Sequence, residues 1–494
     1  MLEKILSKFK DDEQIINLQH HLSFKADSLE TLALEIATSF SYQKENIAIV
    51  LPSLYDSQTL IEYLNAFLDN NSILFYPSDE VLRGETLYSS KEFLKERIHT
   101  LGTLLTSLEK HIVITNSISL LHFLNEPIRF KNEIITIQKG DKIPPLELSK
   151  KLIKNGYTKV NRVESVFEFA LKGEILDIFS PSNSSPYRLE YFDDEIEDIR
   201  EFNAKDELSF QETNNILIYP GLENIFTIDE LNKGKNKITL ELKNLVQNEI
   251  SDELISKTNL FLETLESGGL NDTKTRFLPY FTDKKTCFLN YLKGFNLYYY
   301  RYEDVLSTAN NYYLEAVDYF NELKRNNVAL KEEFNCIKFE DALQNNLTCQ
   351  KIIDEKSNLS TTNIPYPFKG MNQATELLDD LLKDKYETYT FLDNKQIETF
   401  QNICLQYSRK IDLSCSNNGY NIISNSSIPN GFIIPFYKMA LVSSKEIFGV
   451  SEASKAFLKR FKEAKIITKY SDLVPGDYVV HQEQGIGRYL GIEV

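Results

Sequence analysis

Three consecutive carboxylates, Asp193, Asp194 and Glu195, could in principle hold a metal ion. They follow an alternating, strand-like stretch, so a charged hairpin turn is the favoured interpretation. Acid–base catalysis by paired carboxylates would need a pocket and perturbed pKa values, and the sequence signals neither. We therefore expect no catalytic residue and no metal site in this region.

The cysteines and histidines do not form a ligand pattern either. No two cysteines are spaced as CxxC, and the odd count and wide spacing indicate reduced thiols in a cytoplasmic protein. The histidines show no HExxH spacing, which makes a zinc site improbable. The residues concerned are Cys287, Cys336, Cys349, Cys404 and Cys415, and His20, His21, His99, His111, His122 and His481.

A phosphate-binding loop is the next chemistry to look for, because the first third of the chain alternates strands and helices. Such a loop needs glycines, so that backbone N–H groups can approach phosphates, and a lysine to reach the terminal phosphate. The expected position reads LSFKADSLETLALEIA, where Lys25 and Ser28 keep the residue types but no glycine remains. Two interpretations stay open: an α/β domain that never bound nucleotide, or a degenerate motor domain that lost it. Both predict no ATPase activity and no cofactor in this chain.

The elements that would position these residues can be predicted from the periodicity. Helices are expected over 28–40, 57–71 and 89–110, and short apolar strands over 46–52, 72–78 and 111–117. This alternation predicts a parallel sheet in an α/β layer. The N-terminal stretch predicts an amphipathic helix with Leu2, Ile5, Leu6 and Phe9 on one face.

Residues 151–210 differ in character, because they are rich in strands and turns, and they predict a small α+β domain inserted in the α/β domain. In the strand YRLEYF, Tyr187, Leu189 and Tyr191 share one face, which we expect to be the core face. Arg188, Glu190 and Phe192 share the other. An exposed aromatic side chain beside an arginine is typical of an interface anchor, although Phe192 could also pack on its own loop.

Several stretches together resemble the bacterial transcription-repair coupling factors, the Mfd family. The most specific is EFALKGEILDIFSPSNSSPYRLEYFDDEIEDIREF, residues 168–202. FYPSDEVL, KERIHTL, NGYTKVNRVE, RFLPYF, NGFIIPFYKMALVSSKEIFG and PGDYVVHQEQGIGRYLG agree in order. The resemblance covers nearly the whole chain and corresponds to the N-terminal half of the family.

The resemblance implies a layout. It places domain 1a, a degenerate UvrB-like α/β domain of the P-loop type, at 1–132, an inserted UvrA-binding domain 2 at 133–215, and domain 1b at 216–335. Domain 3, a further α/β domain, is expected at 336–450, a linker helix at 451–467, and the start of an SH3/Tudor-like β-barrel, the RNA polymerase interaction domain, at 468–494. A motor half, which uses ATP and Mg²⁺ and contacts DNA, follows in the family.

The resemblance also implies a function and its residues. This chain is expected to be an adaptor that recruits UvrA to stalled RNA polymerase in transcription-coupled nucleotide excision repair. The alternative is an active UvrB-like ATP-dependent DNA helicase. The positions that match the family's UvrA-binding residues are Lys172, Arg188 and Phe192, although the family has arginine at the first of them. The positions expected to bind the RNA polymerase β subunit are His481, Gly485, Gly487, Arg488 and Tyr489.

The bulk properties agree with a protein-binding role. The formal net charge is −17, so the chain as a whole favours protein partners over the phosphates of DNA. No run of about 18 apolar residues is present, so we expect no membrane span. Only two candidate strands of the last module are present; we therefore expect the chain to be cut there, its last residues to be mobile, and polymerase binding to be weak.

Overall fold

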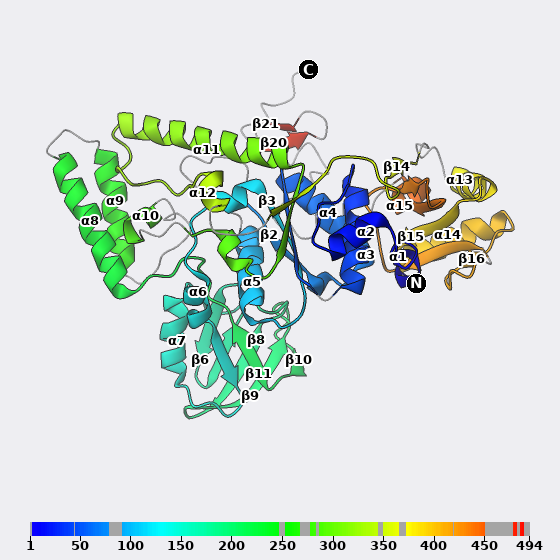
Figure 1. Cartoon of the computed structure of the whole chain (residues 1–494). Helices are drawn as coiled ribbons and strands as arrows, with labels where there is room; N and C mark the ends of the chain where they lie inside the picture. Colours follow the sequence, from blue (N-terminus) through cyan, green and yellow to red (C-terminus); the bar gives the residue numbers. More distant parts are fainter. Residues whose placement is uncertain are drawn as a thin grey trace, which may run out of the picture.

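The computed structural model describes residues 2–43, 45–78, 91–246, 252–266, 277–282, 286–343, 349–364, 372–417 and 419–449, and two short strands within 478–488. All statements below concern these residues. The chain builds two α/β layers side by side, a small strand-rich domain below the N-terminal layer, and a helical arm at the end opposite the second layer (Figure 1). The prediction of an α/β protein of several domains is confirmed at this level.

The first layer is a parallel sheet of five strands in the order β13-β12-β1-β3-β2. Every residue of β1 and β3 is buried, as expected for strands covered on both faces. The predicted strands 46–52, 72–78 and 111–117 are confirmed. The strands are β1 (Ile47–Leu51), β2 (Ile73–Tyr76), β3 (Ile112–Asn116), β12 (Asn296–Tyr300) and β13 (Cys349–Ile352).

Helices cover both faces of this sheet, and each face has its own hydrophobic cluster. The three predicted helices are confirmed as α3, α4 and α5, and Ile5, Leu6 and Phe9 of the N-terminal stretch are buried. One face carries α1 (Leu2–Leu6), α2 (Glu13–Gln19), α3 (Leu29–Tyr42) and α4 (Leu54–Phe67). The other carries α5 (Lys91–Thr106), α6 (Pro127–Glu133), α11 (Tyr302–Arg325) and α12 (Phe339–Leu343), with the short 3-10 helices η2 (Ser117–Leu121) and η4 (Phe288–Tyr291).

The chain leaves this layer for the inserted domain through β4 (Ile135–Gln138) and returns through β11 (Asn215–Ile218). These two strands form an antiparallel pair. The main sheet of the inserted domain has six strands in the order β10-β9-β8-β7-β6-β5, and α7 (Pro145–Lys154) packs against one side. The prediction of a small α+β insertion is confirmed. The strands are β5 (Thr158–Lys159), β6 (Glu168–Lys172), β7 (Ile175–Ile178), β8 (Tyr187–Phe192), β9 (Glu195–Phe202) and β10 (Ser209–Glu212).

After the insertion the chain forms a helical arm before it returns to the first sheet. The arm has a separate apolar cluster that includes Ile238, Phe261 and Phe281. Its helices are α8 (Ile228–Val246), α9 (Asp252–Glu266) and α10 (Leu278–Phe281).

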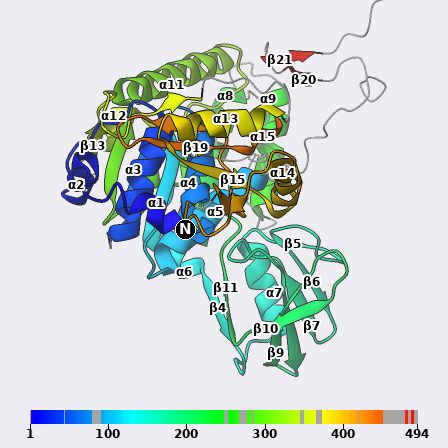
Figure 2. The same cartoon turned by 90° about the vertical axis from the view of Figure 1, so that its right-hand side faces the viewer.

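The sheet of the second α/β layer has a hydrophobic cluster of its own on only one of its two faces. This sheet runs β14-β18-β19-β15-β17-β16, and α13, α14 and α15 cover its outer face. Its inner face packs on α1–α4, so these helices lie between two sheets in one shared cluster (Figures 1 and 2). The elements are β14 (Thr362–Asn363), β15 (Glu387–Leu392), β16 (Ile411–Asp412), β17 (Tyr420–Ser424), β18 (Phe432–Ile434), β19 (Met439–Val442), α13 (Asn372–Lys383), α14 (Asn394–Gln406) and α15 (Ser444–Phe448).

The expected domain boundaries do not all coincide with the limits of these sheets. β12 and β13 lie on opposite sides of the expected 335/336 boundary, yet both belong to the first sheet. The five expected boundaries stay predictions. The expected linker helix lies outside the described residues. Among the described residues, no helix has the length and apolar character needed to cross a membrane.

Candidate protein-docking site

The strands β6 to β9 form two consecutive hairpins that position the predicted docking residues. Gly173 turns β6 into β7 with a φ of +60°, a conformation that glycine adopts without steric cost. Asp193 and Asp194 form the two-residue turn between β8 and β9, and Asp193 has a φ of 58°. Asp193 and Asp194 therefore lie in a hairpin turn, as predicted, and Glu195 is the first residue of β9.

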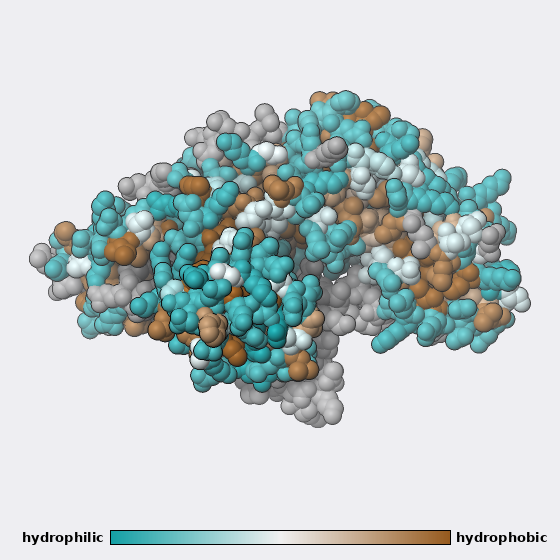
Figure 3. Space-filling model, turned by 90° about the horizontal axis from the view of Figure 1, so that it is seen from below, coloured by the Kyte–Doolittle hydropathy of each residue, from teal (hydrophilic) through white to brown (hydrophobic). Residues whose placement is uncertain are grey.

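Residues alternate between the two faces of β8 as the sequence predicted. Tyr187, Leu189 and Tyr191 are buried in the cluster under α7. Arg188, Glu190 and Phe192 point to the opposite side, and we call this side of β6–β9 the outer face. The space-filling view shows a mostly hydrophilic surface over the inserted domain with a few hydrophobic side chains (Figure 3).

Arg188 is held in one geometry on the outer face. Its Nε donates to Asp177 Oδ1 at 2.7 Å, and its Nη2 donates to Asp177 Oδ2 at 2.8 Å. The guanidinium also lies over the ring of Phe202, 4.8 Å from the centroid. These hydrogen bonds hold the pKa of the guanidinium above its ordinary value. Arg188 is thus a preorganised, partly buried cation.

Lys172 and Phe192 are the more accessible members of the set. Phe192 is 72% exposed at the end of β8, and Lys172 is exposed at the end of β6. Between them Ile175 stands opposite both Lys172 and Glu190 in the ladder, and it is also exposed. The sheet therefore brings the three predicted residues to one face, with an exposed aromatic ring at the end of β8.

The sequence did not reveal the residues that support Arg188. Asp177 and Phe202 both lie in the 168–202 motif, but their contacts depend on strand register, which spacing alone does not give. An acidic residue in the otherwise apolar strand ILDI is the signal that could have pointed to Asp177.

The comparisons with known proteins bear on this face. The UvrB interaction domain model matches residues 135–223, which include the whole inserted sheet. The transcription-repair-coupling factor of Bacillus subtilis is 26% identical over 538 aligned residues, covering 100% of this chain and 44% of that protein. Those of Staphylococcus haemolyticus and Staphylococcus aureus are 24% identical, with 93% of this chain and 41% of each relative covered.

This chain is a relative of the transcription-repair-coupling factors. The resemblance predicted from its motifs is confirmed. The chain spans less than half the length of the relatives cited above.

A second family model, the CarD-like/TRCF RID domain, matches residues 473–494. There β20 (Tyr478–His481) pairs with β21 (Gly485–Arg488) in an antiparallel ladder. His481 stands opposite Gly485, and Arg488 stands opposite Tyr478. Tyr489 lies outside the described residues. The predicted mobility of the last residues stays a prediction.

The position expected for a phosphate loop is occupied by contacts within the chain. Lys25 Nζ pairs with Glu355 Oε2 at 2.8 Å. Ser28 caps α3 by accepting from the Thr31 N–H, and its Oγ lies 2.9 Å from Thr361 Oγ1. Glu355 and the segment 357–361, which sequence reasoning missed, therefore lie beside the N-terminus of α3.

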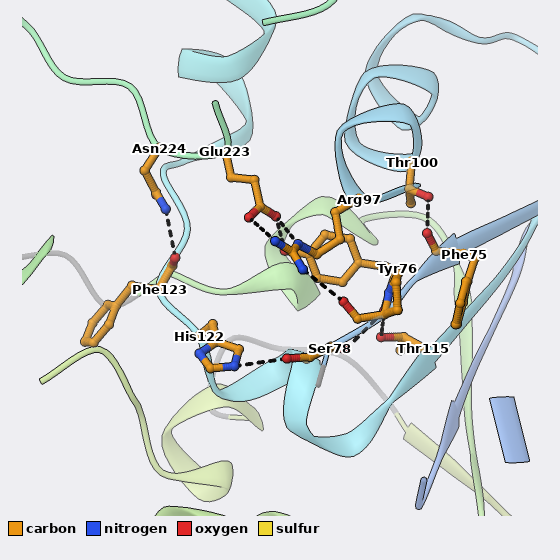
Figure 4. Close-up of polar contacts among 12 residues, drawn as sticks. Phe75, Tyr76, Ser78, Arg97, Thr100, Thr115, His122, Phe123, Glu223 and Asn224 are labelled. Atoms are coloured by element: carbon orange, nitrogen blue, oxygen red, sulfur yellow. Dashed lines mark hydrogen bonds and ion pairs between the residues drawn. The ribbon is translucent and has the colours of Figure 1, made fainter. Parts of the chain in front are cut away.

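A buried polar cluster lies where the inserted domain rejoins the first layer. Arg97 of α5 donates from Nε and Nη2 to the two carboxylate oxygens of Glu223, at 2.8 and 2.9 Å (Figure 4). Tyr76 at the end of β2 donates to Glu223 Oε1 at 3.0 Å. Arg97 lies in KERIHTL, one of the motifs that resemble the family, but the motif by itself predicts no contact for it.

Proposed function

We propose that this chain is the adaptor part of a transcription-coupled repair factor, which recruits UvrA to stalled RNA polymerase. The observation that carries the proposal is the outer face. It presents an exposed aromatic ring and a preorganised arginine within the stretch that the UvrB interaction domain model matches.

Each docking residue has a distinct physical role. Phe192 gains most from burial, because transfer of a largely exposed aromatic ring into a partner's pocket removes apolar surface from water. Arg188 loses little conformational entropy on binding, because Asp177 already fixes its rotamer. Lys172 adds charge at the rim, where we expect it to affect the association rate more than the lifetime of the complex.

The remaining parts of the proposal follow the family. The β20–β21 ladder opens a small β-barrel of the SH3/Tudor type that binds the RNA polymerase β subunit. ATP, Mg²⁺ and DNA are used by a motor region outside these 494 residues. In this chain Lys25 stabilises an ion pair, so Lys25→Ala is expected to leave UvrA binding unchanged.

The test is the affinity of purified UvrA for a set of matched variants. Phe192→Ala is expected to weaken binding by more than about 2 kcal/mol, the hot-spot threshold. Leu146→Ala and Lys150→Glu are the controls, because both residues are exposed on α7, on the opposite side of the same sheet. Both controls are expected to bind like the parent.

Arg188 needs a different design, because Arg188→Glu would also set two carboxylates side by side. The exchange Asp177→Arg/Arg188→Asp keeps an ion pair inside the domain but reverses the positions of the charges. We expect it to weaken UvrA binding while the domain stays folded. Parent-like binding by folded Phe192→Ala and by the exchanged pair would contradict the site.

A further inference from the structure

The segment that leaves the inserted domain contacts several parts of the molecule in succession. We call residues 219–226, which follow β11, the exit strap. Its first residue, Tyr219, packs where Gly102 of α5 has no side chain: a Cβ there would lie 2.4 Å from the Tyr219 ring. The hydroxyl of Tyr219 lies 3.0 Å from Thr106 Oγ1 on the same helix.

The middle of the exit strap is held by the buried cluster of Figure 4. The side chains of Arg97 and Glu223 are only 11% and 15% exposed. Tyr76, which donates to Glu223, is fixed in turn by stacking on Phe288, with ring centroids 3.7 Å apart and planes 5° from parallel. A bidentate pair between fixed partners admits one relative position of α5 and the exit strap.

The end of the exit strap is tied to the first layer and to the helical arm. Asn224 Nδ2 donates to the Phe123 carbonyl at 3.2 Å, and the Ile225 N–H donates to Asn125 Oδ1. Phe226 is buried in the cluster of the helical arm. The strap therefore connects the inserted domain, the first sheet and the arm.

A buried ion pair contributes weakly to net stability, because desolvation of the two charges offsets their attraction. Its geometric requirement is strict, however, since a displaced partner leaves a buried charge unpaired. The chain passes between the first layer and the inserted domain at one place, the β4–β11 pair, and such a connection by itself would allow the domain to swing.

We propose that the exit strap is an orientation lock, in which the Arg97–Glu223 pair fixes the inserted domain relative to the first sheet. The lock sets the direction in which the outer face points, and it does not depend on which partner binds that face. Arg97 and Glu223 are positioning residues in this account.

The experiment measures a distance between spin labels on the two parts. Labels are attached through Tyr55→Cys on α4 and Lys150→Cys on α7, both exposed positions, in a Cys349→Ser background, because the other four cysteines are buried. The parent is expected to give one narrow distance distribution by double electron–electron resonance. The variant Arg97→Gln/Glu223→Gln, which leaves no buried charge unpaired, is expected to broaden it at least twofold.

A second variant keeps the test decisive if the first does not fold. His99→Ala/Thr106→Ala removes the contact of His99 Nδ1 with the Pro181 carbonyl, at 2.8 Å, and the contact with Tyr219. It is also expected to broaden the distribution. The control is Lys154→Gln, which breaks an exposed pair with Glu133 at 3.1 Å near the entry strand and should leave the width unchanged. A parent-like width in every folded variant, or equal broadening in the control, overturns the proposal.

Discussion

The inserted domain and the second α/β layer are attached to the first sheet in opposite ways. The inserted domain has a core of its own, and the chain enters and leaves it through one strand pair and the exit strap. The second layer shares a single cluster with α1–α4, in which Phe391 packs edge-on against Phe67 with ring centroids 5.9 Å apart. The inserted domain is therefore a separable unit, whereas the second layer shares its core with the first.

The largest expected effect comes from excising each region. A fragment of residues 135–223 contains the whole cluster under α7 and is expected to fold alone. A fragment of residues 372–449 would expose the inner face of its sheet, including Phe391 and Leu441, and is expected not to fold. Dispersed amide spectra by NMR from the first fragment and collapsed spectra from the second would agree with the comparison. A well-folded second fragment would show that the shared cluster is dispensable.

Truncation of a core residue should distinguish the two regions within the whole chain. Phe391→Ala is expected to cost about 3–5 kcal/mol and to lower amide protection in both α/β layers together. Leu189→Ala should cost about 2–5 kcal/mol but lower protection only in the inserted domain. Hydrogen–deuterium exchange read by mass spectrometry separates these patterns. Loss of protection confined to the second layer in Phe391→Ala would contradict a common core.

A smaller effect tests how closely the exit strap approaches α5. At an exposed position inside a helix, replacing glycine by alanine usually stabilises a protein by about 1 kcal/mol. In Gly102→Ala the added Cβ meets the Tyr219 ring, so we expect a destabilisation of about 1–3 kcal/mol in urea unfolding. The double variant Gly102→Ala/Tyr219→Ala should be less destabilised than the sum of the two single changes. Simple additivity would mean that the two residues do not contact each other in solution.

The smallest expected effect is a pH dependence that belongs to the shared core alone. Glu35 of α3 is fully buried with Oε2 unpartnered, and burial, with the Asp12 and Asp27 charges adding to it, raises its pKa well above the ordinary 4.5. The folded state then binds more protons than the unfolded state. The contribution of Glu35 to stability is therefore fully present below pH 4.5 and is lost as the pH rises through its raised pKa. In Glu35→Gln the melting temperature of the α/β layers should fall less steeply with rising pH than in the parent. An unchanged pH profile in the variant would show that Glu35 is not the group responsible.

The comparison also shows what the sequence can predict. The strands of the first layer and the alternation in β8 are local patterns, so periodicity found them. The motif resemblance predicted Lys172, Arg188 and Phe192 as one set, and the strand register places all three on one face of the sheet. These successes rest on short stretches of contiguous residues.

Contacts between distant segments could not be predicted in this way. Asp177 beneath Arg188, Glu355 beside Lys25 and Glu223 against Arg97 depend on register and on how layers meet. The shared cluster was missed for the same reason. Apolar faces of α3 and β15 indicate that each is buried, but not that they are buried against each other's layer.

The most direct test of a separable docking domain compares UvrA binding to the whole chain and to the excised fragment 135–223 by isothermal titration calorimetry. The account predicts dissociation constants that agree within about twofold, and a loss of more than about 2 kcal/mol for Phe192→Ala in both. Binding by the whole chain but not by the folded fragment, or a Phe192→Ala fragment that binds like its parent, would contradict it.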